Sequence, residues 1–427
     1  MSLVWRRRVS RNPRMVAFLP LVLLTGACLL TAVALSSCGG PQPSITETPS
    51  GGFSAPTEMR VRLTPSAVPA VELSTTGGYR LLVDQEVVAE SPSTPTTARI
   101  TRQGGAWIIN GTLSRTGHRL TLESLPNGYV RFHASGYRGR MVLSPAGDNM
   151  IVVNALDVES YLAGVLAKEL YPKWSYQTYR ALAIAARTYA LYQKATNGSG
   201  RDFDVTADQS SQMYGGFTGE TDMSRRVVLD TRGQVLAYGP DGHEQIFMTQ
   251  YSASCGGNVN ASSVIRAAED IPPYSGGQVC NDCVNCSHYR WEPVRIPRAE
   301  VLRAVTAVYP NTRDNLGGTL ARIDVKNVTP YGRVLWLDLV GPAEQKVTLR
   351  AEDLRLCLIR VPAGKKLYSM NCQIRIVGDM VEFYEGKGFG HGVGLCQWGA
   401  QGKAEKGWTA EQILQFYYPQ SKVFRVY

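Results

Sequence analysis

The stretch from Gly388 to Gly399 contains the most conspicuous histidine of the sequence, His391, set among glycines at alternate positions. Glycine has no Cβ atom, so this backbone can turn sharply or lie close to another surface. None of these glycines begins the G-x-G-x-x-G pattern of nucleotide-binding loops, and a phosphate site is therefore disfavoured.

A second set of side chains has the types and spacing of metal ligands. It consists of Cys255, Cys280, Cys283, Cys286 and His288. Because C-x-x-C spacing lets two thiolates reach one tetrahedral Zn²⁺, four of these five groups could close a structural zinc site that holds down the loop 255–290. Disulfide bonds are the alternative in an oxidising compartment, where an iron–sulfur cluster is not expected.

The carboxylate of Glu169 lies on the apolar face of a predicted helix. With about 3.6 residues per turn, Leu162, Val165 and Leu166 form an apolar stripe, and Glu169 lies on the same face. Desolvation there would raise the pKa of the carboxyl and keep part of it protonated near neutral pH, which is the state that a general acid needs. The alternative is a solvated position at the helix end, ion-paired with a neighbouring lysine.

The N-terminal segment 1–38 has the polarity order of an export signal or a membrane anchor. Arginines precede an uncharged, mostly apolar run from Met15 to Leu35. The segment ends in Leu-Ser-Ser-Cys38, which resembles the lipobox of bacterial lipoproteins, where this cysteine is cleaved free and acylated. An uncleaved signal anchor is the alternative. Both interpretations predict that the rest of the chain lies outside the cytoplasm, attached to the membrane in the cell envelope.

The charge balance excludes one class of partner. The formal net charge of +10 includes five arginines of the N-terminal segment, and subtracting them leaves +5. So modest an excess suits an anionic envelope polymer and is too weak to indicate nucleic acid.

The exported part divides by composition. Residues 39–57 are rich in Pro, Ser, Thr and Gly and are predicted to be a flexible linker. Residues 58–145 contain short strand-like runs, such as Tyr79–Val83 and Ala106–Ile109, between turn residues, and are predicted to form a small β-rich domain.

Helices enter in the third region, 146–427. Two are expected at about 157–170 and 176–195, separated by Pro172, and a last one begins at the capping box formed by Thr409 and Gln412. Between residue 200 and that last helix the sequence indicates strands and loops. The strand-like runs lie near 227–237, 245–251, 322–326, 334–340 and 372–384. The predicted fold class is therefore α+β, with a β-rich region before a mixed helix and strand domain.

Three separated blocks of this region resemble the SpoIID/LytB family, the stage II sporulation protein D group of bacterial cell-wall proteins. They run from Val158 to Ala190, from Asp204 to Gly216, and through the glycine stretch into Gln397-Trp-Gly-Ala. The likeness covers about residues 138–421. It implies a SpoIID-like catalytic domain that acts on peptidoglycan glycan strands as a lytic transglycosylase, without a catalytic cofactor. It also implies that stem peptides are removed beforehand. Some relatives are described instead as enhancers of a wall amidase.

The resemblance assigns the catalytic role to Glu169. The family places its glutamate before Met-Pro at the end of the corresponding helix, whereas this sequence has Leu170-Tyr171-Pro172, with the tyrosine inserted. The implied reaction needs one carboxylic acid. It protonates the oxygen leaving C1 of N-acetylmuramic acid and then takes a proton from the 6-hydroxyl of that sugar, giving a 1,6-anhydro product. Glu159 and Asp208 are possible helpers.

Other residues of the family blocks are assigned to substrate binding or support of the active site. These are Gln212, Tyr214, His391 and Gln397. His391 could equally brace its loop, Trp398 is expected in the core rather than as a sugar platform, and Arg187 is expected to form a structural ion pair.

The remaining cysteines have simpler interpretations. Cys357 and Cys372 could pair with each other, and Cys396, where relatives often have serine, is expected to be a small buried filler. A cysteine hydrolase using Cys255 and His391 has the residue types and lacks a recognisable nucleophile motif.

Overall fold

The computed structural model describes residues 57–197, 200–265, 270–360 and 367–427. The predicted export segment, with Cys38, and almost all of the predicted linker lie outside these residues. Within the described ranges, no helix combines the length and the apolar character needed to cross a bilayer.

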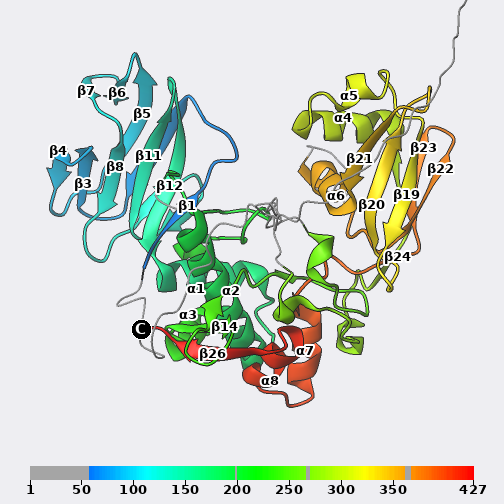
Figure 1. Cartoon of the computed structure of the whole chain (residues 1–427). Coiled ribbons are helices and arrows are strands. Elements are labelled where there is room, and N and C mark those ends of the chain that lie inside the picture. The colour runs from blue at the N-terminus through cyan, green and yellow to red at the C-terminus, as the bar shows by residue number, and fades with distance from the viewer. Residues whose placement is uncertain (1–56, 198–199, 266–269, 361–366) are drawn as a thin grey trace, which may run out of the picture. The chain divides into compact units, whose positions relative to one another are not determined.

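The part of the chain before the first helix is built from strands (Figure 1). They are β1 (Glu58–Arg62), β2 (Ala70–Thr75), β3 (Tyr79–Val83), β4 (Glu86–Ser91), β5 (Thr97–Gln103), β6 (Ala106–Ile109), β7 (Leu113–Thr116), β8 (Leu120–Ser124), β9 (Val130–Phe132), β10 (Ser135–Tyr137), β11 (Arg140–Ala146) and β12 (Asn149–Asp157). They form two sheets, the first of which also includes β13 (Val205–Thr206), in the orders β13-β1-β12-β11-β8-β3-β4 and β10-β9-β2-β5-β6-β7. Alternate residues, such as Met59 and Val61 of β1, are fully buried, as expected for sheets with one face in a core.

The helices follow from β12 onward. They are α1 (Val158–Glu169), α2 (Tyr176–Asn197), α3 (Asp222–Asp230), α4 (Arg298–Val308), α5 (Thr312–Asn315), α6 (Ala351–Arg360), α7 (Gln397–Glu405) and α8 (Ala410–Tyr417). The later strands are β13 (Val205–Thr206), β14 (Gln234–Tyr238), β15 (Gln245–Ile246), β16 (Tyr251–Ser252), β17 (Arg290–Trp291), β18 (Val294–Pro297), β19 (Arg322–Val328), β20 (Val334–Val340), β21 (Lys346–Arg350), β22 (Gln373–Val377), β23 (Met380–Tyr384), β24 (Gly386–Lys387), β25 (Leu395–Cys396) and β26 (Ser421–Arg425). The α+β class is confirmed.

Helix α1 begins and ends where its sequence indicates. The Asp157 carboxylate caps it by accepting hydrogen bonds from the backbone N–H groups of Glu159 and Ser160. It ends at Glu169 because Leu170 adopts an extended conformation, with φ −121° and ψ 152°, before Pro172. Local sequence thus defines the end of α1, and Glu169 is the last residue of this helix.

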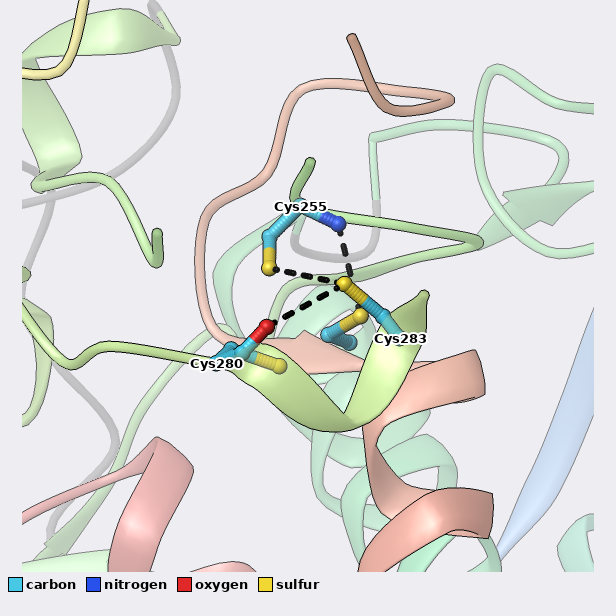
Figure 2. Close-up of side chains that lie close together, drawn as sticks. Cys255, Cys280 and Cys283 are labelled. Carbon is cyan, nitrogen blue, oxygen red and sulfur yellow. Dashed lines mark hydrogen bonds between the residues drawn. The ribbon is translucent and has the colours of Figure 1, made fainter. Parts of the chain in front are cut away.

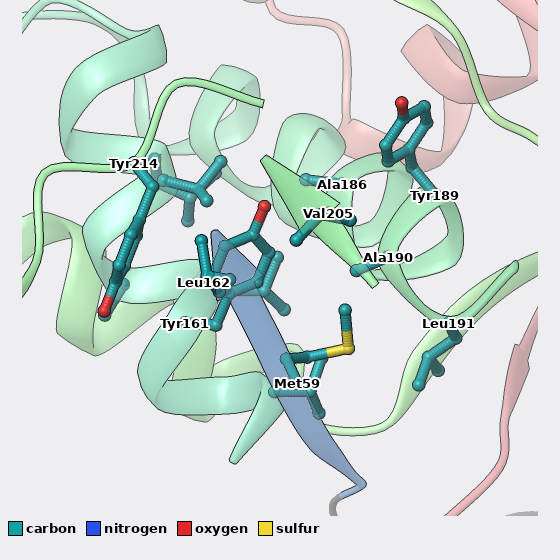
Figure 3. Close-up of a cluster of buried hydrophobic side chains, with 14 of the residues drawn as sticks. Met59, Tyr161, Leu162, Ala186, Tyr189, Ala190, Leu191, Val205 and Tyr214 are labelled. Atoms are coloured by element: carbon teal, nitrogen blue, oxygen red, sulfur yellow. The ribbon is translucent and has the colours of Figure 1, made fainter. Parts of the chain in front are cut away.

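Helix α2 packs closely against its neighbours. Its alanines from Ala181 to Ala190 are fully buried, so backbones can approach one another across small side chains. Figure 3 shows the side chains of α1 and α2 meeting in one buried cluster with strand residues. Those labelled are Met59, Tyr161, Leu162, Ala186, Tyr189, Ala190, Leu191, Val205 and Tyr214.

The expected ion pair of Arg187 is confirmed. Its fully buried guanidinium donates to both carboxylate oxygens of Glu159, at 3.0 and 2.6 Å. Glu159 also accepts hydrogen bonds from the Gly233 backbone N–H and the Tyr427 hydroxyl. Through these contacts Glu159 links α1 to α2, to Gly233 and to Tyr427.

The expectation of strands and loops between residue 200 and the last helix is wrong in several places. The segment 227–237 begins in α3, which the capping box of Thr221 and Ser224 starts, and only its end is strand β14. Helices α4, α5, α6 and α7 were also not expected. Helix α7 contains Gly399 and Gly402, which have poor helix propensity, and tertiary packing outweighs that propensity.

A second core lies between residues 291 and 383. Helices α4 and α6 pack on each other and on the strands of this segment around buried residues such as Phe383 and Leu337. This segment supplies α6 to the site described next.

Candidate functional site

Glu169 is held at the end of α1 by two donors from distant parts of the chain. Its Oε1 accepts a hydrogen bond from the Met213 backbone N–H at 2.8 Å, and its Oε2 accepts one from the Gln397 side-chain amide at 2.9 Å. Gln397 is the first residue of α7, 228 residues away in sequence. The carboxyl is therefore oriented from both sides.

Burial raises the pKa of Glu169 above its usual value. The N–H of Met213, the amide of Gln397 and the hydroxyl of Tyr251 oppose this shift because each favours the charged carboxylate, and burial outweighs them. The protonated fraction at neutral pH is thus larger than for a solvated glutamate, as the helical periodicity predicted.

A buried polar network is connected to the Glu169 carboxyl through Tyr251. The Gln212 amide donates to the Tyr251 hydroxyl at 2.9 Å, and its carbonyl oxygen accepts from the Tyr161 hydroxyl at 3.0 Å. Gln212 is 1% exposed, so its side chain is enclosed within this network. Tyr214 is also buried, and its hydroxyl donates to Asn154 at 2.8 Å.

His391 braces its loop through both ring nitrogens. Nε2 lies 3.0 Å from the Tyr251 carbonyl oxygen, and Nδ1 accepts from the Val393 backbone N–H at 3.1 Å. These partners define the neutral tautomer protonated at Nε2, and burial lowers the pKa of the ring to about 4. Both ring nitrogens are thus engaged within the protein, and His391 lies among the residues of the cavity wall described next.

Glu169, Gln397 and His391 line one cavity of about 520 Å³. Helix α6 supplies another part of its wall through Glu352, Arg355 and neighbouring residues. A second cavity of about 770 Å³ shares lining residues with the first, among them Met213, Leu356 and Phe389, so the depression continues beyond the carboxyl.

The pKa values of the two glutamates that line the cavity, Glu169 and Glu352, are shifted in opposite directions. Although burial alone would raise the pKa of Glu352, the Arg355 guanidinium holds it below the usual value by contacts of 2.6 and 3.0 Å. The pKa of Glu352 is thus lowered, while that of Glu169 is raised. The helpers considered from sequence are elsewhere: Glu159 is in its ion pair, and Asp208 is exposed beside the adjoining cavity.

Four buried cysteines gather beside α7. The ligand atoms of Cys255, Cys280, Cys283 and Cys396 all lie within 4.8 Å of one another, and Figure 2 shows the first three converging from two loops. Three belong to the predicted ligand set. Cys396 replaces Cys286 and His288, which lie outside this group, because β25 brings Cys396 alongside β16 just before the Cys255 turn.

The cluster has the dimensions of a tetrahedral thiolate site. The Sγ atoms of Cys255 and Cys283 are 3.7 Å apart, and four sulfurs at a Zn–S distance of about 2.3 Å are separated by about 3.8 Å. All seven cysteines of the described ranges are free, including Cys357 and Cys372. Neighbouring thiols that hydrogen-bond to Cys283 hold its pKa far below the usual value, whereas burial raises that of Cys396.

The cysteine cluster and the carboxyl are joined through α7. The Cys396 sulfur caps this helix by accepting from the Gly399 N–H at 3.3 Å, and the next residue, Gln397, bonds Glu169. A side chain at Gly399 would meet the Cys280 sulfur at 2.5 Å, so the helix and the cluster pack without space between them. Lys403 of α7 also pairs with Asp282, at 2.8 Å, between the clustered cysteines of that loop.

Comparison with known proteins identifies the family. The chain is 31% identical over 283 residues to an uncharacterized protein of Brachyspira hyodysenteriae, covering 66% of this chain and 70% of that protein. Residues 146–238 match the family model SpoIID, described as stage II sporulation protein. The chain belongs to the SpoIID family. The resemblance to this family seen in the sequence is thus confirmed. The matched residues include α1, α2 and Glu169.

More distant SpoIID-family relatives carry functional names. The chain is 23% identical over 287 residues to stage II sporulation protein D of Bacillus subtilis, which covers 64% of this chain and 75% of that protein. It is 25% identical over 290 residues to the amidase enhancer of the same organism, covering 60% of this chain and 39% of the enhancer.

Some residues of this SpoIID-family site were missed in the sequence. Met213 acts through its backbone, Tyr251 lies in a short strand, and Glu352 and Arg355 belong to the unexpected helix α6. The i, i+3 spacing of Glu352 and Arg355 was the available signal for the last two. For Cys396, the available sign of a place near the site was its position next to Gln397.

Proposed function

We propose that the chain is a lytic transglycosylase that cleaves the glycan backbone of peptidoglycan between N-acetylmuramic acid and N-acetylglucosamine, in cell-wall remodelling. The observation that carries this proposal is the Glu169 carboxyl, oriented by two N–H donors, raised in pKa and lining an extended depression. The export signal and lipobox resemblance at Cys38 support action in the cell envelope, with the protein attached to the membrane.

In the first step Glu169 acts as a general acid. Each of its oxygens accepts one N–H, and a carboxyl oxygen has two lone pairs, so a proton can reside on the carboxyl and be passed to the glycosidic oxygen. The bond from C1 of N-acetylmuramic acid to that oxygen breaks, and the N-acetylglucosamine end leaves as an alcohol. Glu352, which also lines this cavity, is held in an ion pair with Arg355.

In the second step the Glu169 carboxylate is the base. It takes the proton of the 6-hydroxyl of the same N-acetylmuramic acid as that oxygen bonds to C1, which regenerates the acid and closes a 1,6-anhydro ring. The atoms balance without water, so the reaction needs no second carboxylate to activate a nucleophile.

Product analysis tests this function. Purified glycan strands, with and without stem peptides, are incubated with the protein, and the products are weighed by mass spectrometry. Fragments ending in the anhydro sugar are expected from peptide-stripped strands. Products heavier by one water would indicate a hydrolase, and freed peptides would indicate an amidase.

The pH dependence of kcat/KM tests whether the Gln397 amide lowers the pKa of Glu169. Because the acid must be protonated, cleavage should fall as pH rises through the raised pKa of Glu169. The Gln397 amide favours the charged carboxylate, so Gln397→Leu should raise this pKa further and move the alkaline limb of the kcat/KM profile to higher pH. Gln209→Leu, at an exposed glutamine of the same cavity, should leave the limb in place. A limb that moves to lower pH in the Gln397 variant would contradict the assignment.

A second candidate function is a wall-binding enhancer of an N-acetylmuramoyl-L-alanine amidase. The similarity to the amidase enhancer of Bacillus subtilis favours it. In that case the protein alone would leave glycan strands intact and would increase peptide release by a wall amidase added to the same strands.

We further propose that the four clustered cysteines hold a structural Zn²⁺. The burial of all four sulfurs and the 3.7 Å separation of two of them support this. When bound, the ion would fix the loops carrying Cys255, Cys280 and Cys283 to the start of α7, and it would supply no chemistry at the substrate.

A further inference from the structure

Three aromatic rings cluster on the segments that follow Glu169 and Gln397 in the chain. The ring centroids of Tyr171 and Trp174 are 5.1 Å apart, those of Trp174 and Trp398 5.0 Å, and those of Tyr171 and Trp398 5.6 Å. We call these three residues the aromatic platform. Rings at such distances, tilted or edge-on to one another, brace each other mechanically.

The platform is joined to both members of the Glu169 and Gln397 pair. Tyr171 follows Glu169 by two residues, which limits their Cα atoms to about 7 Å apart. Trp398 follows Gln397 directly, and its backbone N–H donates to Ala253, a residue of the cavity wall, at 3.0 Å. The platform is therefore attached to the segments that carry Glu169 and Gln397, and its three rings lie outside the residues that line that cavity.

The rings are accessible and held in place. Tyr171 is 58% exposed, and both tryptophans are half-buried. The Tyr171 carbonyl oxygen accepts hydrogen bonds from the Tyr179 hydroxyl at 3.2 Å and from the Trp174 N–H at 3.0 Å, and Pro172 restricts the backbone between them. A rigid aromatic surface loses little conformational entropy on binding, which makes it an effective contact for a ligand.

We propose that the aromatic platform binds a saccharide unit of the glycan next to the bond that Glu169 cleaves. One face of a pyranose ring presents C–H groups, which match the apolar face of Tyr171 or Trp398, while its hydroxyls remain in water. Trp398 also packs against the core, as expected from the sequence, and braces the exposed Tyr171 ring. This inference rests on the proposed function and names Tyr171, the residue inserted between Leu170 and Pro172, as a substrate-binding residue.

The kinetic test compares variants on long peptide-stripped glycan strands. Tyr171→Ala should raise KM for long peptide-stripped glycan strands at least about fivefold while leaving kcat within about twofold, because the lost contact is made to a unit that does not react. Tyr171→Phe should retain wild-type KM, since the ring and not the hydroxyl makes the contact. Tyr331→Ala, at another exposed tyrosine, is the matched control and should change neither constant.

A binding test separates this inference from the proposed function. In the Glu169→Gln background, affinity for the same strands and for chitotetraose is measured by calorimetry, and Tyr171→Ala should weaken it at least about fivefold. Ring-dependent binding without cleavage by the wild-type protein would overturn the transglycosylase and keep the platform. Cleavage with unchanged KM and unchanged binding in Tyr171→Ala would overturn the platform alone.

Discussion

Replacing Glu169 with glutamine should lower the rate of anhydro-product formation by at least about 100-fold, because the amide can neither donate the proton to the glycosidic oxygen nor accept one from the 6-hydroxyl. The glutamine carbonyl can still accept the Met213 N–H that now reaches Oε1, so the fold should persist. The measurement is the initial rate of release of anhydro-ended fragments, with thermal unfolding recorded on the same samples.

Asp208→Asn is the matched acid-to-amide control. Asp208 is exposed, lies beside the adjoining cavity, and accepts hydrogen bonds from Thr206 and the Ser210 N–H. Its replacement should change the rate by less than about fivefold. Loss of activity of similar size in both variants, or a Glu169→Gln protein within about tenfold of wild type, would remove Glu169 from the acid role.

The position of Glu169 could be predicted because it depends on local physics. A helix that starts at an Asp cap and ends before Leu170-Tyr171-Pro172 is set by capping and by the proline, and helical periodicity then decides which face carries the carboxyl. The final capping box is of the same kind, since a short sequence pattern determines it. The Arg187 ion pair was expected without its partner, Glu159, which lies 28 residues away on another helix.

The partners of Glu169 could not be predicted in this way. Met213 and Gln397 reach it from positions 44 and 228 residues away, and the sequence contains no local rule for such contacts. Helix α7 has glycines that argue against a helix, and it forms because Cys396 caps it and Lys403 pairs with Asp282. Cys396 was interpreted as a buried filler for the same reason: its three sulfur neighbours lie on segments far away along the chain.

Cys396→Ser should release the metal. With one of four thiolates replaced by a weaker ligand, zinc content should fall from about one to well below one ion per chain, and Tm should drop by at least about 5 °C, because structural zinc sites contribute their binding energy to folding. Cleavage should fall as well, since Cys396 caps α7 and the neighbouring Gln397 orients Glu169. Elemental analysis of the purified protein and thermal unfolding measure the first two effects independently of activity.

Cys286→Ser is the control that discriminates between ligand sets. Cys286 is buried and lies in the same loop, outside the four-cysteine cluster, so its replacement should leave the zinc content at about one per chain. Alkylation of the denatured wild-type protein, with chelator and without reductant, distinguishes metal from disulfides: all four clustered cysteines should react. Clustered cysteines that react only after reduction would show that they are paired, and a Cys286→Ser protein lacking zinc would restore the ligand set first expected from the sequence.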